Sequence, residues 1–434
     1  MKRIVYEAEN SLEGRERNRG AVHGMVHALR DFGDTRFLVL RLPKTMLQCV
    51  LPAELSLPED FCDGAAVRVY GDMRAEERAP GGRELLVSRI EVVSAPSEPM
   101  PVPIHKYKMG LSPETELDLR PITLRTARSR AMFRLQEGIV RGFRDALYQE
   151  GFTEIHTPKL SMGSAEGGAN MFKLPYFGKK AVLAQSPQLY KQMMVGAFER
   201  VFEVGPVFRA EKHNTPRHLN EYTSLDFEMG FIESFEDIMA MEEKVLAYIF
   251  RLLESEYAAE LNALKVQLPD ISGGIPSIRF DEAKRFVSEK YSREIRDPFD
   301  LEPEEETLIS RAVYEETGCE LAFVTHYPSK KRPFYAMDDP ADSRYTLSFD
   351  LLMRGMEITT GGQRIHDYSM QVAKMEKKGL DSQEFEDYLM IHKYGMPPHG
   401  GLGLGLERLL MRLVGEKNVR MCALFPRDVS RLRP

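Results

Sequence analysis

One polar stretch between two alternating segments limits the fold more than any other part of the chain. Residues 201–204 and 224–228 alternate apolar and polar side chains, as half-buried strands do. The residues between them are polar, which predicts an antiparallel hairpin closed by a charged loop that carries Arg209, Arg217 and His218. Guanidinium groups bind phosphate oxygens bidentately, so this loop suits a polyphosphate. A solvated surface hairpin explains the same pattern.

Length and charge restrict the class of protein. At 434 residues the chain is too long for one ordinary core, so we expect two or three domains. The net charge of −7 argues against a generally basic nucleic-acid-binding protein, so any contact with RNA must come from local patches. The four cysteines lack metal-ligand spacing, which predicts reduced thiols that serve only in packing. The sequence has neither a signal peptide nor an apolar run of membrane-spanning length, so we expect a cytoplasmic protein without a membrane partner.

Five short alternating runs precede residue 95. They are residues 21–27, 36–40, 46–50, 66–71 and 84–87. Five strands separated by turn residues fit a small barrel of the oligonucleotide-binding (OB) type, to which we assign residues 1–100. Phe37 and Gln48 lie on the second and third runs, where such barrels offer stacking surfaces and hydrogen bonds to bases. By pattern alone, Phe37 fits a core position better.

Prolines mark the end of this first domain. Four of them fall between residues 96 and 103, which predicts a linker, and we assign 101–125 to a hinge and 126–434 to a second domain. A helix is predicted over 126–150, followed by a strand over 152–157.

A charged and mostly helical region follows from about 235 to 330. No residue pattern in this region indicates catalysis or ligand binding. Its acidic run, 304–306, is interpreted as a solvated helix face.

Two later segments could contact a nucleotide. A hairpin turning at 354–355 would place Asp350 and Glu357 side by side, as oxygen ligands for magnesium or simply as a surface carboxylate pair. Residues 400–410 are rich in glycine and lead into an amphipathic helix, but they match neither a P-loop nor a dinucleotide fingerprint. Glycines let a strand lie close under a flat ligand, and Arg408 at the helix start can reach phosphates.

Together these segments resemble the three motifs of class II aminoacyl-tRNA synthetases. The strand ending at Pro158, within about 150–160, resembles motif 1. Residues 208–211, within about 201–231, resemble motif 2, and residues 403–408, within about 400–415, resemble motif 3. The order of the motifs and the preceding barrel are similar to the subgroup that charges aspartate, asparagine and lysine. Within it, the chain most resembles the archaeal and eukaryotic aspartyl-tRNA synthetases.

The resemblance implies an α+β chain. An N-terminal five-stranded OB-type β-barrel would bind the anticodon. Residues 126–434 would form a class II catalytic domain with an antiparallel sheet flanked by helices, and the region of about 235–330 would be a helical insertion between motifs 2 and 3. A homodimer with motif 1 at its interface is also implied.

The resemblance further implies how ATP and magnesium are bound. The ATP-binding positions would be Arg209, Ala210, Glu211, Arg217, His218, Leu219, Tyr222, Glu357, Gly405, Leu406, Glu407 and Arg408. Magnesium would be held by Asp350, Glu357 and Thr360. Activation of an amino acid depends on alignment and charge stabilisation, with Arg209 and Arg408 as catalytic residues and no general base.

The aspartate pocket is implied in the same way. Its positions would be Glu166, Gln188, Lys191, Arg209, Asp226, Thr360 and Arg364. An aspartate pocket must neutralise a second carboxylate, whereas an asparagine pocket is penalised by an unpaired buried cation. Lys191 and Arg364 supply the cations, and asparaginyl enzymes generally lack the lysine.

The barrel would read the tRNA anticodon. The implied contacts are His27, Arg30, Phe37, Gln48 and Pro80. His27 and Pro80 match relaxed relatives, so we expect an enzyme that charges both tRNA(Asp) and tRNA(Asn) with L-aspartate. The alternatives are a strict aspartyl enzyme, an asparaginyl-tRNA synthetase, an ammonia-dependent amide synthetase and a silent tRNA-binding regulator.

Overall fold

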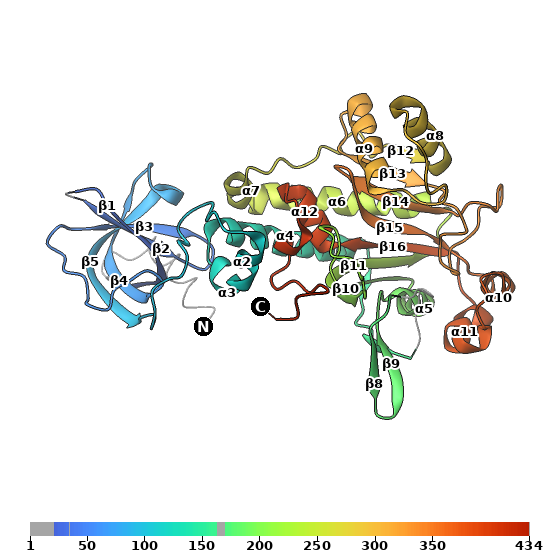
Figure 1. The fold of residues 1–434 in the computed structure, drawn as a ribbon, viewed down its shortest axis with the longest axis horizontal. Coiled ribbons are helices and arrows are strands. Elements are labelled where there is room, and N and C mark those ends of the chain that lie inside the picture. The colour runs from blue at the N-terminus through green and yellow to red at the C-terminus, as the bar shows by residue number, and fades with distance from the viewer. Residues whose placement is uncertain (1–20, 34, 163–169, 434) are drawn as a thin grey trace. The chain divides into compact units, whose positions relative to one another are not determined.

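The computed structural model describes residues 21–33, 35–162 and 170–433, and Glu166 lies outside them. The chain divides into two compact units. One contains the residues up to Ser112 together with Pro121–Ala127, and the other contains Pro113–Arg120 and the chain from Arg128 onward. Figure 1 labels the elements of both units.

The first unit is a closed five-stranded barrel with the strand order β1-β2-β3-β5-β4, as predicted. Its strands are β1 (Ala21–Asp31), β2 (Arg36–Arg41), β3 (Met46–Leu51), β4 (Ala66–Ala75) and β5 (Arg83–Ser94). Leu38 and Leu40 of β2 pack inside with Cys49 and Leu51 of β3. Because successive strand residues point to opposite faces, the residues between them face outward.

The second unit is built on an eight-stranded sheet with the order β12-β13-β14-β15-β16-β11-β10-β6. Its strands are β6 (Thr153–Glu154), β10 (Arg200–Phe208), β11 (Glu221–Gly230), β12 (Ser277–Arg279), β13 (Leu321–Thr325), β14 (Ser348–Met353), β15 (Met356–Arg364) and β16 (His399–Gly405). The centre is antiparallel, but β12 pairs with β13 and β6 with β10 in parallel. The sheet is therefore mixed rather than purely antiparallel.

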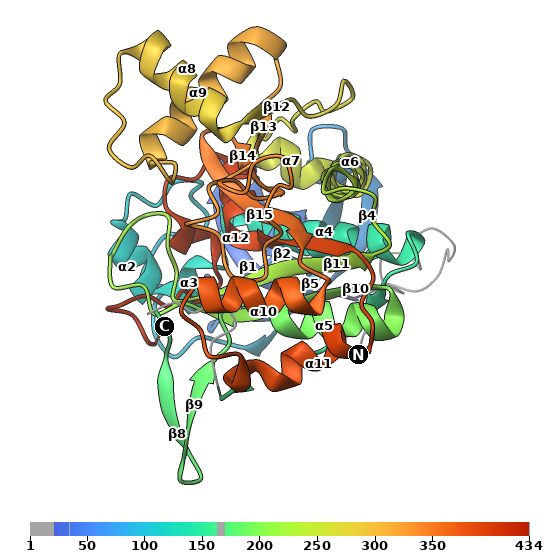
Figure 2. The same cartoon turned by 90° about the vertical axis from the view of Figure 1, so that its right-hand side faces the viewer.

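A second, three-stranded sheet joins β7 (Leu160–Ser161), β9 (Lys179–Leu183) and β8 (Lys173–Tyr176). Figure 2 shows its β8–β9 hairpin extending away from the large sheet. The strand predicted over 152–157 is shorter than expected, because only Thr153 and Glu154 pair with β10.

Helices flank the large sheet, as predicted. The helices of the described chain are α2 (Pro113–Asp118), α3 (Arg120–Thr123), α4 (Ala127–Gln149), α5 (Gln188–Phe198), α6 (Glu236–Glu256), α7 (Ala258–Leu264), α8 (Phe280–Tyr291), α9 (Pro303–Thr317), α10 (Tyr368–Lys377), α11 (Glu386–Tyr394) and α12 (Leu406–Val414), of which α3 lies mostly in the first unit. Short 3-10 turns cover Pro80–Gly82, Ser382–Phe385 and Val419–Cys422. Apolar residues of α4, α6 and α12 form the main core with β10, β11 and β16. None of the helices in the described ranges is long and apolar enough to cross a membrane.

Alternation along β11 separates this core from a polar face. Leu225 and Phe227 are fully buried in the core. Ser224 and Asp226, at the intervening positions, line a cavity on the opposite face. The two-residue period of a strand therefore gives the sheet one apolar and one functional face.

Two sequence-based interpretations need correction. The acidic run on α9 is not a solvated face: Glu305 is fully buried and lies 2.7 Å from Lys284 Nζ, and Glu306 is also buried. Consecutive helical residues point about 100° apart, so Glu304 alone of the three faces water. The cysteines are free thiols as predicted, but Cys62 is exposed and so is not a packing residue.

Candidate active site

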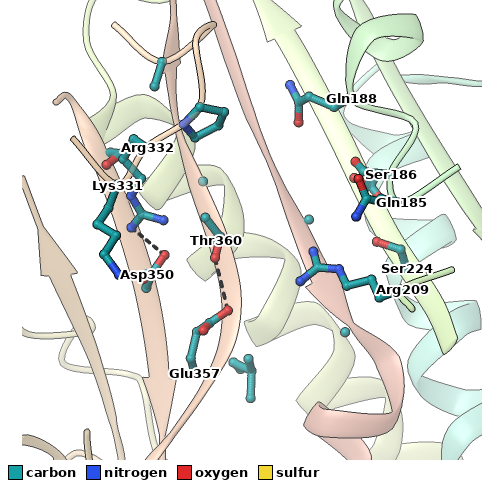
Figure 3. A pocket seen from close by; sticks show the side chains of 18 of the residues that line it. Gln185, Ser186, Gln188, Arg209, Ser224, Lys331, Arg332, Asp350, Glu357 and Thr360 are labelled. Atoms are coloured by element: carbon teal, nitrogen blue, oxygen red, sulfur yellow. Dashed lines mark hydrogen bonds and ion pairs between the residues drawn. The ribbon is translucent and has the colours of Figure 1, made fainter. Parts of the chain in front are cut away.

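A cavity of about 580 Å³ opens on the polar face of β11, β16 and β15. The predicted site residues that line it are Gln188, Arg209, Glu211, Arg217, His218, Leu219, Tyr222, Asp226, Asp350, Glu357, Thr360, Arg364, Gly405, Glu407 and Arg408. Figure 3 shows Gln188 and Arg209 on one side of the cavity. Asp350, Glu357 and Thr360 lie on the other side, with a strand between the two groups.

Strand register explains how these polar groups are spaced. Asp350 on β14 lies opposite Thr360 on β15. Across the next strands, Thr360 lies opposite Gly403 on β16, and Gly403 lies opposite Asp226 on β11. Neighbouring strands are about 4.8 Å apart, so two strand spacings separate Thr360 from Asp226. Gly403 has no side chain to fill this gap, and β16 therefore forms a flat floor between two polar walls.

A β-bulge in β15 corrects the predicted pairing of the carboxylates. Glu357 lies opposite Leu352, and Asp350 lies opposite Thr360, so the two acids are not side by side. Ile358 is the extra residue where the register shifts. Residues three apart on a regular strand point to opposite faces, and the bulge instead brings Glu357 and Thr360 to one face. The Thr360 hydroxyl donates to Glu357 Oε1 at 3.1 Å (Figure 3).

Each carboxylate has a basic neighbour. Asp350 Oδ1 accepts from Arg332 Nη2 at 2.8 Å, and Glu357 Oε1 lies 3.4 Å from Arg408 Nη1. Burial raises the pKa of Asp350 to about 6, with Arg332 opposing the shift and Glu357 adding to it. Burial also acts to raise the pKa of Glu357, but Arg408 and Arg209 outweigh it and hold that pKa below its usual value. Glu357 is therefore the more acidic of the two.

These oxygens suit a metal ion that binds together with phosphate groups. Within the described ranges, no three His, Cys, Asp or Glu side chains are grouped as metal ligands. Magnesium is commonly held by only one or two carboxylates, with substrate phosphates and water completing its shell. Asp350, Glu357 and the Thr360 hydroxyl fit that donor set.

The loop between β10 and β11 brings cations to the cavity. Arg209, Arg217 and His218 all line it, so the three residues converge on one place. The Arg209 guanidinium lies 5.8 Å from the centre of the Tyr222 ring. Burial, together with the charge of Arg408, lowers the pKa of His218. The imidazole is therefore neutral at physiological pH and contributes hydrogen bonds rather than charge.

A neutral cluster of two cations and two anions lies at the other end of the cavity. Lys191 of α5 is only 1% exposed, and its Nζ lies 3.0 Å from Asp226 Oδ1 and 3.4 Å from Glu228 Oε2. Arg364 Nε donates to Glu228 Oε1 at 2.8 Å, and Arg364 Nη2 lies 3.4 Å from Gln188 Oε1. Burial acts to raise the pKa of Glu228, but Arg364 and Lys191 outweigh it and lower that pKa.

Some predicted residues lie away from the cavity surface in the described part of the chain. Lys191 lies beneath the surface, where its Nζ also donates to the carbonyl oxygen of Leu402 at 2.7 Å. Ala210 donates its backbone N–H to Asn170 at 2.9 Å, and Leu406 is buried in the core.

Three important residues were missed from the sequence. Glu228 continues the alternation that contains Asp226, so the strand pattern could have identified it. Arg332 lies in an irregular segment before β14, and no periodicity predicts its contact with Asp350. Glu306 lies in the insertion and contacts Arg217 through an ion pair that only the fold brings together.

The barrel places several of the predicted RNA contacts on its outer face. Arg30 of β1 and Phe37 of β2 are cross-strand partners, and their neighbour Leu38 points into the core. Gln48 Nε2 donates to Glu84 Oε2 at 2.8 Å, which fixes the orientation of the Gln48 amide.

The remaining two residues that were predicted to contact the anticodon differ in exposure. Pro80 begins an exposed 3-10 turn. The register of β1 against β2 shifts between Val26 and Ala28, which places His27 in a β-bulge, and His27 is only 5% exposed. The structure therefore places Pro80 at the surface, but not His27.

Residues 112–429, which include the whole cavity, match the family model described as tRNA synthetases class II (D, K and N). The chain belongs to this family. As a class II aminoacyl-tRNA synthetase, it uses ATP to activate an amino acid. The family inferred from the three motifs is therefore confirmed.

Relatives of this class II synthetase match it over nearly its whole length. The aspartate–tRNA(Asp/Asn) ligase of Deinococcus radiodurans is 48% identical over 418 residues, which are 95% of each chain. The ligase of the same name from Thermus thermophilus is 45% identical, over 95% of this chain and 96% of that protein. The crystal structure of asparaginyl-tRNA synthetase from Pyrococcus horikoshii complexed with asparaginyl-adenylate is similar, with a TM-score of 0.87 and 34% identity over 95% of this chain and 96% of that chain.

Proposed function

We propose that this synthetase forms aspartyl-adenylate from L-aspartate and ATP and then transfers aspartate to both tRNA(Asp) and tRNA(Asn). The observation that carries the choice of amino acid is the buried cluster of Lys191, Arg364, Asp226 and Glu228. The Deinococcus and Thermus relatives named as aspartate–tRNA(Asp/Asn) ligases support the choice of tRNA.

Charge balance in the cluster favours aspartate over asparagine. Without Lys191, the carboxylates of Asp226 and Glu228 would face Arg364 alone, and the net negative charge would repel a substrate carboxylate. With Lys191 the cluster is neutral. Arg364 donates through Nε and Nη2 to Glu228 and through Nη2 to the carbonyl oxygen of Gly401, so Nη1 of its five-donor guanidinium can bind the aspartate side chain. Asparagine would bring only a neutral amide to this cation.

Adenylate formation needs alignment of two anions. An oxygen of the aspartate α-carboxylate attacks the α-phosphorus of ATP, the bond to the bridging oxygen of the β-phosphate breaks, and pyrophosphate leaves. Arg209 contacts both reacting groups and neutralises the charge that grows on the α-phosphate. The flat floor of β16 lets the two substrates meet in line.

Other lining residues hold the two substrates. Glu211 accepts from the adenine amino group, and Tyr222 stacks on the adenine ring. Arg217, His218 and Arg408 bind the outer phosphates, and Gln188 contacts the aspartate ammonium group.

Asp350, Glu357 and Thr360 hold magnesium in this proposal. When bound, the ion would neutralise phosphate charge and make pyrophosphate a better leaving group. Arg332 and Arg408, which also line the cavity, pair with the two carboxylates.

A homodimer completes the proposal. Thr153 and Glu154 of β6 end the large sheet, and the nearby segment exposes Leu160 and Met162, the latter by 81%. An exposed sheet edge with apolar neighbours suits pairing with a second copy. Analytical ultracentrifugation should therefore give the mass of two chains, and a monomer at micromolar concentration would contradict this part of the proposal.

Aspartate-dependent exchange of pyrophosphate into ATP tests the activation step. We expect exchange with aspartate and none above background with asparagine. Exchange driven by asparagine alone would identify an asparaginyl enzyme, and no exchange with either amino acid would favour a silent regulator.

Charging of purified tRNA tests the second step. Labelled aspartate should be attached to both tRNA(Asp) and tRNA(Asn). Charging of tRNA(Asp) alone would show a strict enzyme, and charging of neither after normal exchange would favour an amide synthetase.

A further inference from the structure

The helical insertion reaches the back of the ATP site through one carboxylate. Glu306 lies in the first turn of α9 and is 7% exposed. Its Oε2 accepts from Arg217 Nη2 and, at 3.1 Å, from the backbone N–H of Glu357. Arg217 and Glu357 line the cavity, whereas Glu306 stands behind them, outside the described lining. A single carboxylate oxygen therefore contacts both the β10–β11 loop, through Arg217, and strand β15, through the proposed magnesium ligand Glu357.

The start of α9 is held firmly. Glu302 and Glu305 form a capping box, and Glu305 also pairs with Lys284 at 2.7 Å. Thr307 packs against Gly355 in the turn before β15. The helix turn that carries Glu306 is thus held on two sides.

The pair leaves the guanidinium of Arg217 able to act on substrate. An arginine has five N–H donors, and the contact with Glu306 uses one Nη2 edge. The remaining donors can face phosphate oxygens across the cavity.

We infer that Glu306 is a positioning residue for ATP, which sets the Arg217 guanidinium and the start of β15 at a fixed separation so that both meet the same polyphosphate. This inference rests on the proposed ATP-binding role of Arg217. A purely structural ion pair would anchor α9 to the sheet and would leave ATP affinity unrelated to Arg217.

Three variants test this role. Glu306→Ala removes both contacts, Glu306→Gln keeps an oxygen acceptor, and Glu304→Gln changes the neighbouring carboxylate, whose side chain is 66% exposed. ATP binding is measured by calorimetry, and KM values for ATP and aspartate by pyrophosphate exchange. Because hydrogen bonds to charged groups contribute about 1.5–3 kcal/mol, Glu306→Ala should weaken ATP binding about tenfold or more. In Glu306→Ala, the KM for aspartate should change less than about twofold. Glu306→Gln should recover part of the lost ATP affinity. Glu304→Gln should bind ATP as the wild type does.

A double-mutant cycle separates positioning from folding. In an Arg217→Ala background, Glu306→Ala should weaken ATP binding by less than about twofold further, because its partner is already absent. Equal losses in both backgrounds would overturn the inference, as would parallel losses in ATP and aspartate affinity. Calorimetry needs no amino acid, so a wild-type protein that binds ATP but does not exchange with aspartate would contradict the proposed substrate and still allow this comparison.

Discussion

At the scale of single residues, buried charge decides what the cavity accepts. Lys191 does not line the cavity in the described part of the chain, yet it offsets one of the two carboxylates, Asp226 and Glu228, so that the cluster is neutral and Arg364 can bind a substrate carboxylate. A buried ion pair is weak evidence for stability, but loss of one partner leaves an uncompensated charge. Specificity and stability are therefore linked at this position.

Replacing Lys191 with methionine should cost stability and activity together. Loss of one partner from a buried pair typically costs about 3–5 kcal/mol, and aspartate-dependent exchange should fall at least about a hundredfold. Urea unfolding and exchange kinetics measure the two effects. Lys191→Met combined with Asp226→Asn should recover most of the stability, because charge balance returns. The exposed Lys244→Met serves as a control, and an equal effect there would contradict the explanation.

Glu242 should make stability fall with rising pH. Burial raises the pKa of this α6 carboxyl to about 8, with Thr359 opposing the shift and Asp350 adding to it. The folded state thus keeps the proton while the unfolded chain loses it above its ordinary pKa. The contribution of Glu242 to the free energy of unfolding is complete below the pKa that this carboxyl has in the unfolded chain. It is lost as pH rises toward 8, by about 1.4 kcal/mol per pH unit.

Glu242→Gln should therefore flatten the decline in unfolding free energy between about pH 4.5 and 8 relative to the wild type. Chemical denaturation at several pH values measures the slope. The exposed Glu254→Gln on the same helix is the matched control. A decline as steep in Glu242→Gln as in the wild type would show that another group is responsible.

At the scale of elements, close packing of strands shapes the floor of the cavity. A Cβ on Gly401 would lie 2.1 Å from the carbonyl oxygen of Phe227 and 2.3 Å from Glu228 Oε2. The atoms nearest to a Cβ on Gly405 would belong to the Arg408 side chain, at 3.7 Å, which is an ordinary van der Waals contact. Of these two glycines of β16, only Gly401 therefore lies where close packing excludes a side chain.

Gly401→Ala should destabilise the protein, because overpacking costs about 1–3 kcal/mol and here the obstacle is backbone. Gly405→Ala should unfold at nearly the same denaturant concentration as the wild type. Equilibrium denaturation of both variants checks this difference, and equal midpoints would argue against close packing as the cause.

At the scale of the whole molecule, the two units contain two different sets of proposed substrate-binding residues. The cavity lies wholly in the second unit, and the proposed anticodon residues lie in the barrel. Activation and tRNA selection should therefore respond to different substitutions.

Phe37→Ala should raise the KM for tRNA about tenfold, since stacking of a base on an aromatic ring contributes about 1–3 kcal/mol. Steady-state charging of tRNA(Asp) measures this effect. Pyrophosphate exchange, which uses no tRNA, should be unchanged, because the cavity lies wholly in the second unit. An unchanged KM for tRNA would remove Phe37 from the anticodon site.

The barrel, the alternating strands around the charged loop and the identity of most cavity residues could be predicted from the sequence. These features depend on local periodicity and on residue types whose chemistry suits phosphate, so they can be read along the chain. Glu228 was equally readable, because it continues the alternation of β11.

Which charged side chains form pairs could not be predicted from the sequence and depends on the packing of distant elements. Arg217 and Glu306, or Arg332 and Asp350, are joined by packing between elements that no local pattern connects. The bulge at Ile358 likewise depends on how β14 and β15 register, and it reverses which residues of β15 share a face. Pairing between distant residues and the burial of their charges set the electrostatics of the cavity. Neither can be read from the spacing of apolar residues along a single helix or strand.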